Sequence, residues 1–373
     1  MGRYRWPRRT ALATALVGLL AGLLAGCAGY TIGRPTPVPG TGPHGMPQPT
    51  ATQIAAGANP NPRGPQMNPF VAELRPPGAP AAANPYAWLQ DVRSSKTRHW
   101  ILVEARATRK ALAAIPQRAW IVSRLRQLQG GGIRAASSDV VVTHILYLTP
   151  DGVRLPMEVA HRRGLALDGN RPTLLSVYHS TGKPVARLLQ PFVLVWLEMG
   201  GVYARAEVRN GLAKVPAPQG GGKVPDRSIA LGDLFSAAQS LIDDHYTRRA
   251  RLGIHGRGFG GLMAGAAVTV RPEFFGAALP TGTWREYRRI ASGDCFPPTL
   301  IVTAEHDGDF RPWRGYELAA ALQAEQLCGH PILLRVESDE GAGAPAAQRR
   351  ERMADELAFA ARWLGARAPG SAP

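Results

Sequence analysis

The sequence predicts an α/β protein whose mostly parallel sheet is covered by helices on both faces. Between residues 140 and 364, short apolar runs alternate with longer segments whose apolar residues recur at helical spacing. Such alternation favours parallel strands joined by helical crossovers, because the strands of that kind of sheet are buried on both faces. The chain of 373 residues is 45% hydrophobic, which is enough for a sizeable core.

An antiparallel hairpin is predicted to open the sheet. Val140–Tyr147 forms its first strand, Asp151-Gly152 is a turn signal, and Leu155–Ala160 returns as the second strand. Further strands are expected at Thr173–Tyr178, Gly201–Glu207, Arg251–His255, Phe274–Leu279, Thr299–Thr303 and Ile332–Val336. Helices are expected at Leu231–His245, Phe259–Val270, Trp313–Leu327 and Pro345–Leu364.

Helical periodicity also precedes the hairpin, from Asn84 to Leu128, with a new element starting at Pro116. The stretch before Asn84 is rich in proline and glycine and lacks periodicity, which is typical of an extended tether. The expected parts are a signal peptide at 1–27, a disordered tether at 28–83, a helical segment at 84–129, the α/β domain at 140–367 and a disordered tail at 368–373.

The first 27 residues have the pattern of an export signal. Four arginines precede the apolar run Ala11–Ala25, which is too short to span a bilayer comfortably. The run ends in Leu24-Ala25-Gly26-Cys27, which resembles the lipobox of bacterial lipoproteins, where the cysteine receives the lipid. We therefore expect a membrane anchor at Cys27 in the bacterial cell envelope, and Ala28 favours the outer membrane facing the periplasm. The alternative is an ordinary signal peptide in which Cys27 occurs by chance.

The composition excludes several classes of protein. The net charge is +17, and +13 remains without the four arginines of the signal. If the protein contacts a polyanion, we expect it to be an anionic polymer of the cell envelope. No aromatic residues interleave a basic stripe, so nucleic-acid binding is not expected. Three cysteines are too few for a cysteine-rich zinc or iron–sulfur site, and we expect neither a metal nor a cofactor.

A glycine-rich turn, Gly256–Gly261, lies between a predicted strand and a predicted helix. As a dinucleotide-binding motif it needs a carboxylate after the next strand, where Pro280-Thr281-Gly282 supplies none. The turn also fits G-x-S-x-G, the nucleophile elbow of α/β-hydrolases. In that alignment Gly258 stands where the nucleophilic serine belongs, and the N–H of Phe259 lies where an oxyanion would bind.

Several blocks within residues 84–365 resemble, in the same order, the prolyl oligopeptidase family of serine peptidases. The resemblance implies that residues 140–367 form that family's α/β-hydrolase domain. The blocks are Asn84–Asp91 (NPYAWLQD), Pro150–Met157 (PDGVRLPM), His161–Gly164 (HRRG), Ile254–Gly261 (IHGRGFGG), Thr303–Asp307 (TAEHD) and Gly341–Pro345 (GAGAP).

The chain departs from the family at the residues that carry out catalysis. The resemblance implies that Gly258 replaces the nucleophile and Glu340 the catalytic histidine, whereas Asp307 keeps the acid. Tyr178 and Phe259 keep the oxyanion-binding positions.

Parts of the family that contact substrate are also missing. The β-propeller has no counterpart, because only about ten residues, 130–139, separate the helical segment from the hairpin. The family's substrate-binding arginine falls on Asp309, and its RGGGE loop is reduced to Arg209-Asn210-Gly211-Leu212.

Serine catalysis requires a nucleophile, a base and an orienting acid, and here only the acid remains. The sequence therefore predicts a pseudopeptidase that binds or scaffolds a peptide ligand or an envelope protein. The alternative is an active serine-type peptidase or esterase with a rearranged site at Ser180 and His179. For Cys295 and Cys328 a disulfide in an oxidising periplasm and two buried thiols are both open.

Overall fold

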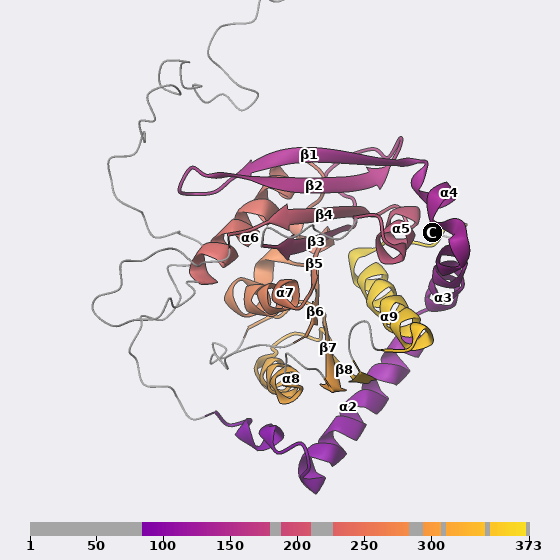
Figure 1. The fold of residues 1–373 in the computed structure, drawn as a ribbon. Helices are drawn as coiled ribbons and strands as arrows, with labels where there is room; N and C mark the ends of the chain where they lie inside the picture. The colour runs from indigo at the N-terminus through magenta and orange to yellow at the C-terminus, as the bar shows by residue number, and fades with distance from the viewer. Residues whose placement is uncertain are drawn as a thin grey trace, which may run out of the picture. The chain divides into compact units, whose positions relative to one another are not determined.

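The computed structural model describes residues 84–179, 188–209, 227–282, 294–306, 311–339 and 344–370, all within one unit of the chain, Arg63–Pro373. Their centre is an eight-stranded sheet with helices on both faces (Figure 1). The strand order is β1-β2-β4-β3-β5-β6-β7-β8. The predicted α/β-hydrolase fold is confirmed, and no β-propeller occurs in the described residues.

The hairpin strands are antiparallel and the rest of the sheet is parallel. Strand β1 pairs with β2 in unbroken register, β2 pairs antiparallel with β4, and β4 pairs parallel with β3. Because β5 lies on the other side of β3, the strand order reverses between them, and α/β proteins bind ligands at the carboxyl ends of such strands. The strands are β1 (Val140–Leu148), β2 (Arg154–Arg162), β3 (Thr173–Tyr178), β4 (Val202–Glu207), β5 (Leu252–Arg257), β6 (Ala277–Thr281), β7 (Thr299–His306) and β8 (Ile332–Asp339).

Two helical layers cover the sheet, one on each side in Figure 1. One layer contains α6 (Arg227–Asp243), α7 (Phe259–Val270) and α8 (Trp313–Glu325). The other contains α3 (Arg118–Gln127), α4 (Ile133–Ser137), α5 (Pro191–Glu198) and α9 (Ala346–Leu364). Successive strand residues serve opposite layers, so Leu175 packs in the first core and Leu174 in the second.

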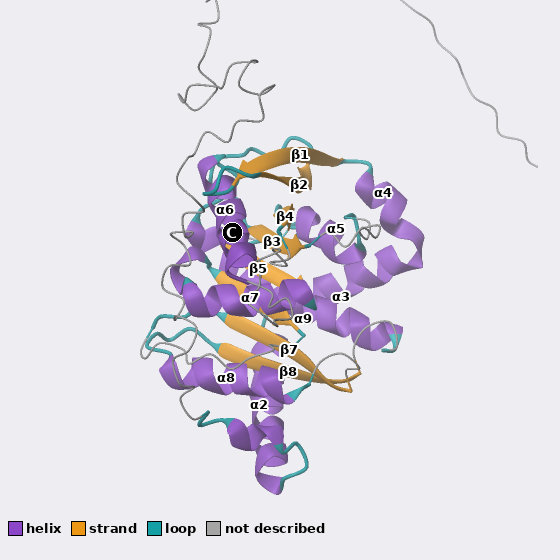
Figure 2. Ribbon diagram, turned by 60° about the vertical axis from the view of Figure 1, so that its left-hand side comes forward, coloured by secondary structure: helices purple, strands orange, loops and turns teal. Residues whose placement is uncertain are grey.

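The part of the predicted N-terminal helical segment that precedes Pro116 packs along the β8 edge of the sheet (Figure 2). Its long helix α2 (Ser95–Ala113) lies against β8, and Thr108 Oγ1 accepts the N–H of Leu334 at 3.1 Å. The preceding turn η1 (Ala87–Gln90) packs on α8, where Asn84 and Gln90 both donate to Glu317 Oε1, at 2.7 and 2.9 Å. Burial raises the pKa of Glu317, and these two amides partly oppose the rise.

Several elements differ from the sequence prediction: α4 was not predicted, and α6 begins at Arg227 rather than Leu231. Helix α5 was not predicted, because its residues Phe192–Leu197 are all apolar and buried and so show no periodicity. Strand β6 begins at Ala277 rather than Phe274, since Pro272–Phe274 forms a short 3₁₀ turn. The ring of Phe274 packs on Phe235 with centroids 5.3 Å apart, which holds this turn beneath α6.

The predicted signal peptide and tether, with Cys27, lie outside the described residues, as do residues 371–373 of the predicted tail. Among the helices that the structure describes, none has the length and apolarity needed to cross a membrane.

Candidate functional site

The turn between β5 and α7 has the backbone of a nucleophile elbow. Gly258 adopts φ 54° and ψ −119°, immediately before helix α7 begins at Phe259. A positive φ is costly for residues with a side chain, and hydrolases accept this strain in order to present the nucleophile at a sharp turn. The elbow is therefore present here, although its central residue has no side chain.

The other glycines of the elbow are required by close packing. A Cβ on Gly256 would lie 2.2 Å from the carbonyl carbon of Gly260, and one on Gly261 would lie 2.0 Å from the carbonyl oxygen of Thr281. A Cβ on Gly258 would meet no atom of the described residues within 4 Å. Among the described residues, position 258 thus has room for a side chain that glycine does not supply.

Tyr178, at the oxyanion-binding position, ends strand β3 next to the elbow strand. Its hydroxyl donates to Glu207 Oε2 at 3.3 Å, and the guanidinium of Arg205 lies 5.6 Å from the ring centroid. Burial raises the pKa of Tyr178, and the charge of Glu207 raises it further. The phenol therefore stays protonated at neutral pH and can donate a hydrogen bond, and in this structure it donates to Glu207.

His179, the histidine of the alternative site, lies beside the elbow. Its ring meets that of Phe259 edge-on with centroids 4.4 Å apart, and its Nδ1 is buried with no hydrogen-bond partner among the described residues. Ser180, its proposed nucleophilic partner, lies outside the described residues. The structure thus places one member of the alternative pair next to the elbow.

The acid position Asp307, the former histidine position Glu340, and Asp309 lie outside the described residues. The strands that lead to the first two positions are described. β7 ends at His306 and β8 at Asp339, and these two residues are paired in register. Positions 307 and 340 therefore leave the sheet from neighbouring carboxyl ends.

A buried histidine lies in the strand just before the elbow. His255 stacks on Phe192 with centroids 4.6 Å apart, and neither of its ring nitrogens has a hydrogen-bond partner among the described residues. Burial, with Arg257 and Arg352 adding to it, lowers the pKa of His255 from 6.5 to about 3. His255 is therefore a neutral core residue and not a catalytic base.

The burial of His255 predicts a dependence of stability on pH. Below about pH 6.5 the unfolded chain binds a proton that the folded chain excludes, so stability falls as the solution is acidified. We expect His255 to contribute about 2 kcal/mol to the loss of unfolding free energy between pH 7 and 5. Urea unfolding of His255→Leu should lack this component, whereas the exposed control His99→Leu should keep it. Equal pH dependence in both variants would contradict the assignment.

Charged residues on the buried face of α9 were missed by the sequence interpretation. Arg352 pairs with Glu337 of β8 at 2.9 Å, and Arg335 and Arg118 both pair with Asp355. The only available signal was the presence of charges at core-facing positions of a helix. These pairs hold α9 and β8 together near the strand end that leads to position 340.

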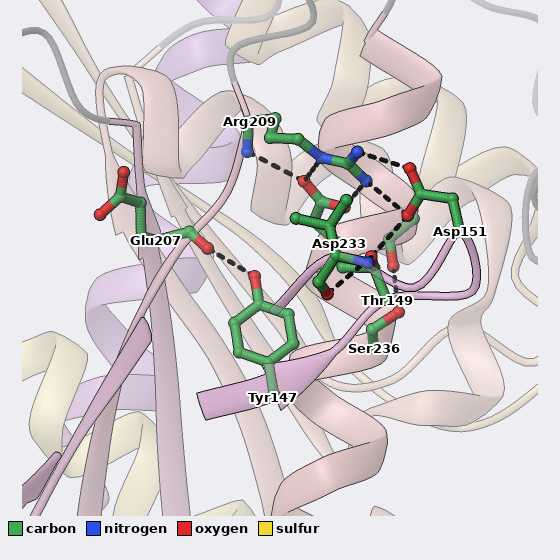
Figure 3. Close-up of polar contacts among 9 residues, drawn as sticks. Tyr147, Thr149, Asp151, Glu207, Arg209, Asp233 and Ser236 are labelled. Atoms are coloured by element: carbon green, nitrogen blue, oxygen red, sulfur yellow. Dashed lines mark hydrogen bonds and ion pairs between the residues drawn. The ribbon is translucent and has the colours of Figure 1, made fainter. Parts of the chain in front are cut away.

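A second ion cluster, the Arg209 clamp, consists of Arg209, Asp233 and Asp151 (Figure 3). Arg209 follows β4 and binds Asp233 of α6 through its backbone N–H and its guanidinium, with the shortest distance 2.6 Å. The same guanidinium binds Asp151 of the hairpin turn at 2.6 Å. The clamp therefore joins the end of β4 to α6 and to the hairpin turn, and Arg209 and Asp151 are 58 residues apart in the chain.

A disulfide joins Cys295 and Cys328, with a Cα–Cα distance of 5.1 Å. Of the two states that the sequence left open, a disulfide or two buried thiols, the structure has the disulfide. His330 Nδ1 lies 3.9 Å from Cys295 Sγ. These three residues are the grouping in the described chain that resembles a metal site, but the two sulfurs are bonded to each other.

The sheet order and the elbow define an α/β-hydrolase. Comparison with known families finds a match to the prolyl oligopeptidase family over residues 192–292 and 283–367. The prolyl endopeptidase of Elizabethkingia miricola is 26% identical over 264 residues, covering 61% of this chain and 37% of that protein. Prolyl oligopeptidase A of Amanita bisporigera is 25% identical over 285 residues, covering 66% of this chain and 37% of that protein.

Solved structures agree with this result. One from a study of two prolyl endopeptidases matches with a TM-score of 0.52 and 28% identity, covering 61% of this chain and 39% of that chain. Oligopeptidase B of Leishmania major has a TM-score of 0.54 at 19% identity, which supports the fold alone. The hydrolase domain of this chain belongs to the prolyl oligopeptidase family. The chain spans little more than a third of the length of these curated relatives.

Proposed function

We propose that this protein is a catalytically inactive prolyl oligopeptidase that acts by binding or scaffolding a peptide or an envelope protein. The observation that carries the proposal is Gly258, because the elbow holds its active backbone conformation around a residue with no side chain. A nucleophile cannot be supplied at this position by any rotamer change. Glu340 at the former histidine position supports the same conclusion from the sequence.

Retention of part of the site favours a binding role. The elbow turn, the donor Tyr178 and the start of α7 at Phe259 all remain at the carboxyl ends of the central strands. In α/β sheets this is where ligands bind, whatever the chemistry that follows. A site that keeps the elbow backbone and a hydrogen-bond donor, but has neither a serine at position 258 nor a histidine at position 340, is suited to holding a ligand without cleaving it.

We place the protein in the bacterial envelope, attached through a lipid on Cys27. The basic apolar leader and its Leu24-Ala25-Gly26-Cys27 ending support this placement. The Cys295–Cys328 disulfide supports it independently, because disulfides persist in oxidising compartments such as the periplasm.

The proposal is tested by labelling the full chain, in bacterial membranes, with a fluorophosphonate probe that reacts with activated serines. The parent and Gly258→Ser should stay unlabelled, while Gly258→Ser combined with Glu340→His should be labelled. Loss of either the serine or the histidine of such a triad costs on the order of a million-fold in rate, so both must return.

The same experiment separates the alternative function. Labelling of the parent that disappears in Ser180→Ala and in His179→Ala would show a rearranged active site and would overturn the proposal. The parent treated with the probe after heat denaturation serves as the background control.

A further inference from the structure

An apolar groove lies where the C-terminal ends of α2 and α9 meet the start of β8. Its volume is about 390 Å³, within the range of small-molecule sites in proteins. Since it adjoins the first residues of β8, it lies at the opposite end of the parallel strands from the elbow. Its principal lining residues are Leu112, Ile115, Pro116, Leu333, Phe359 and Trp363.

One cation lies in the lining of this groove. Arg362 is exposed, and it forms no ion pair or hydrogen bond with the described part of the chain. Arg118, which follows α2, is by contrast bound to Glu351 and Asp355. An apolar wall with a single available guanidinium is complementary to an amphipathic anion, because the guanidinium can bind a carboxylate through two parallel hydrogen bonds.

The chemistry of the lining favours an acyl chain over a peptide. Apart from Arg362 and the indole N–H of Trp363, the lining side chains carry no polar atoms. Pro116 and Pro331 also lack a backbone N–H. A peptide laid here would leave its amides without partners, and burying an unsatisfied amide is costly. A hydrocarbon chain has no such groups.

We propose that this groove binds a fatty acid, with the acyl chain along the apolar wall and the carboxylate on Arg362. The site is independent of the elbow and of the proposed loss of peptidase activity. It would give the protein a ligand that membranes supply.

Calorimetric titration with dodecanoate below its micelle concentration tests the proposal, using the full chain with Cys27→Ala so that no covalent lipid is present. We expect one site, with affinity about tenfold weaker in Arg362→Gln, as for loss of a charged hydrogen bond. Ala111→Trp, which fills the groove from its exposed wall, should abolish binding. Dodecanol lacks the carboxylate. Its affinity for the parent should therefore be no higher than the affinity of dodecanoate for Arg362→Gln.

Two matched controls keep the test specific. Ala113 is exposed on the same turn of α2 as Ala111 but does not line the groove, so Ala113→Trp is the control for Ala111→Trp. Arg109→Gln, the control for Arg362→Gln, removes a cation elsewhere on α2. Both should bind dodecanoate as the parent does, and thermal melts should show that every variant is folded. Failure of the folded parent to bind, or equal affinity in the parent, Arg362→Gln and Ala111→Trp, would overturn the proposal.

Discussion

Replacing Gly261 with alanine is expected to lower the free energy of unfolding by about 4 kcal/mol or more. The new Cβ would lie 2.0 Å from the carbonyl oxygen of Thr281 and 3.0 Å from that of Gly256. Both atoms belong to backbone that is paired between β5 and β6, through Gly256 with Pro280 and Arg257 with Thr281. The clash cannot be relieved by a side-chain rotation, so it must displace α7 or break the pairing.

The matched control is Gly258→Ala, because it makes the same substitution within the same elbow. Here the added methyl group meets no described atom within 4 Å, so the expected cost is that of a side chain at positive φ, about 1–3 kcal/mol. Urea unfolding followed by circular dichroism measures both values. Equal losses in the two variants would show that the packing at Gly261 is looser than the structure indicates.

Arg209→Met is expected to destabilise the protein by about 3–5 kcal/mol, because it leaves a buried carboxylate without its cation. The side chain of Asp233 is fully buried, and its described polar contacts all come from Arg209. The backbone N–H of Arg209 remains in the variant and satisfies part of the carboxylate. Methionine preserves most of the length of the side chain, so the loss reports mainly the missing charge.

Asp151→Asn serves as the control for this clamp. Asp151 binds the same guanidinium, but its side chain is 39% exposed, so its loss should cost less than about 1 kcal/mol. Chemical unfolding of both single variants and of the double variant would measure the difference in unfolding free energy. A loss of less than about 1 kcal/mol in Arg209→Met would contradict the assigned role of the guanidinium.

Several residues in or beside the family-like blocks have structural roles that do not depend on catalysis. Arg209 and Asp151 hold the hairpin to α6, and Asn84 and Gln90 hold the N-terminal segment to α8. The glycines at 256 and 261 allow α7 to approach the sheet. These contacts can therefore form in a domain with glycine at position 258, which is consistent with the proposed binding role.

Local patterns in the sequence were enough to predict most of the fold and the location of the elbow. The hairpin was marked by Asp151-Gly152 between two apolar runs, and the elbow by glycines between a strand and a helix. These signals are local because turn residues and apolar periodicity act over a few positions. The same signals failed for α5, which is buried on all sides and so has no polar face to give a period.

Only the tertiary structure decided the contacts between residues distant in the chain. The partnership of Arg209 with Asp233 and Asp151, the isolation of His255 in the core, and the Cys295–Cys328 bond depend on which strands become neighbours. The groove beside Arg362 likewise arises from three separate segments, and no one of them shows it alone. The sequence by itself determined that position 258 carries no nucleophile, whereas the structure decided that the elbow around it is still formed, because that depends on packing between β5, β6 and α7.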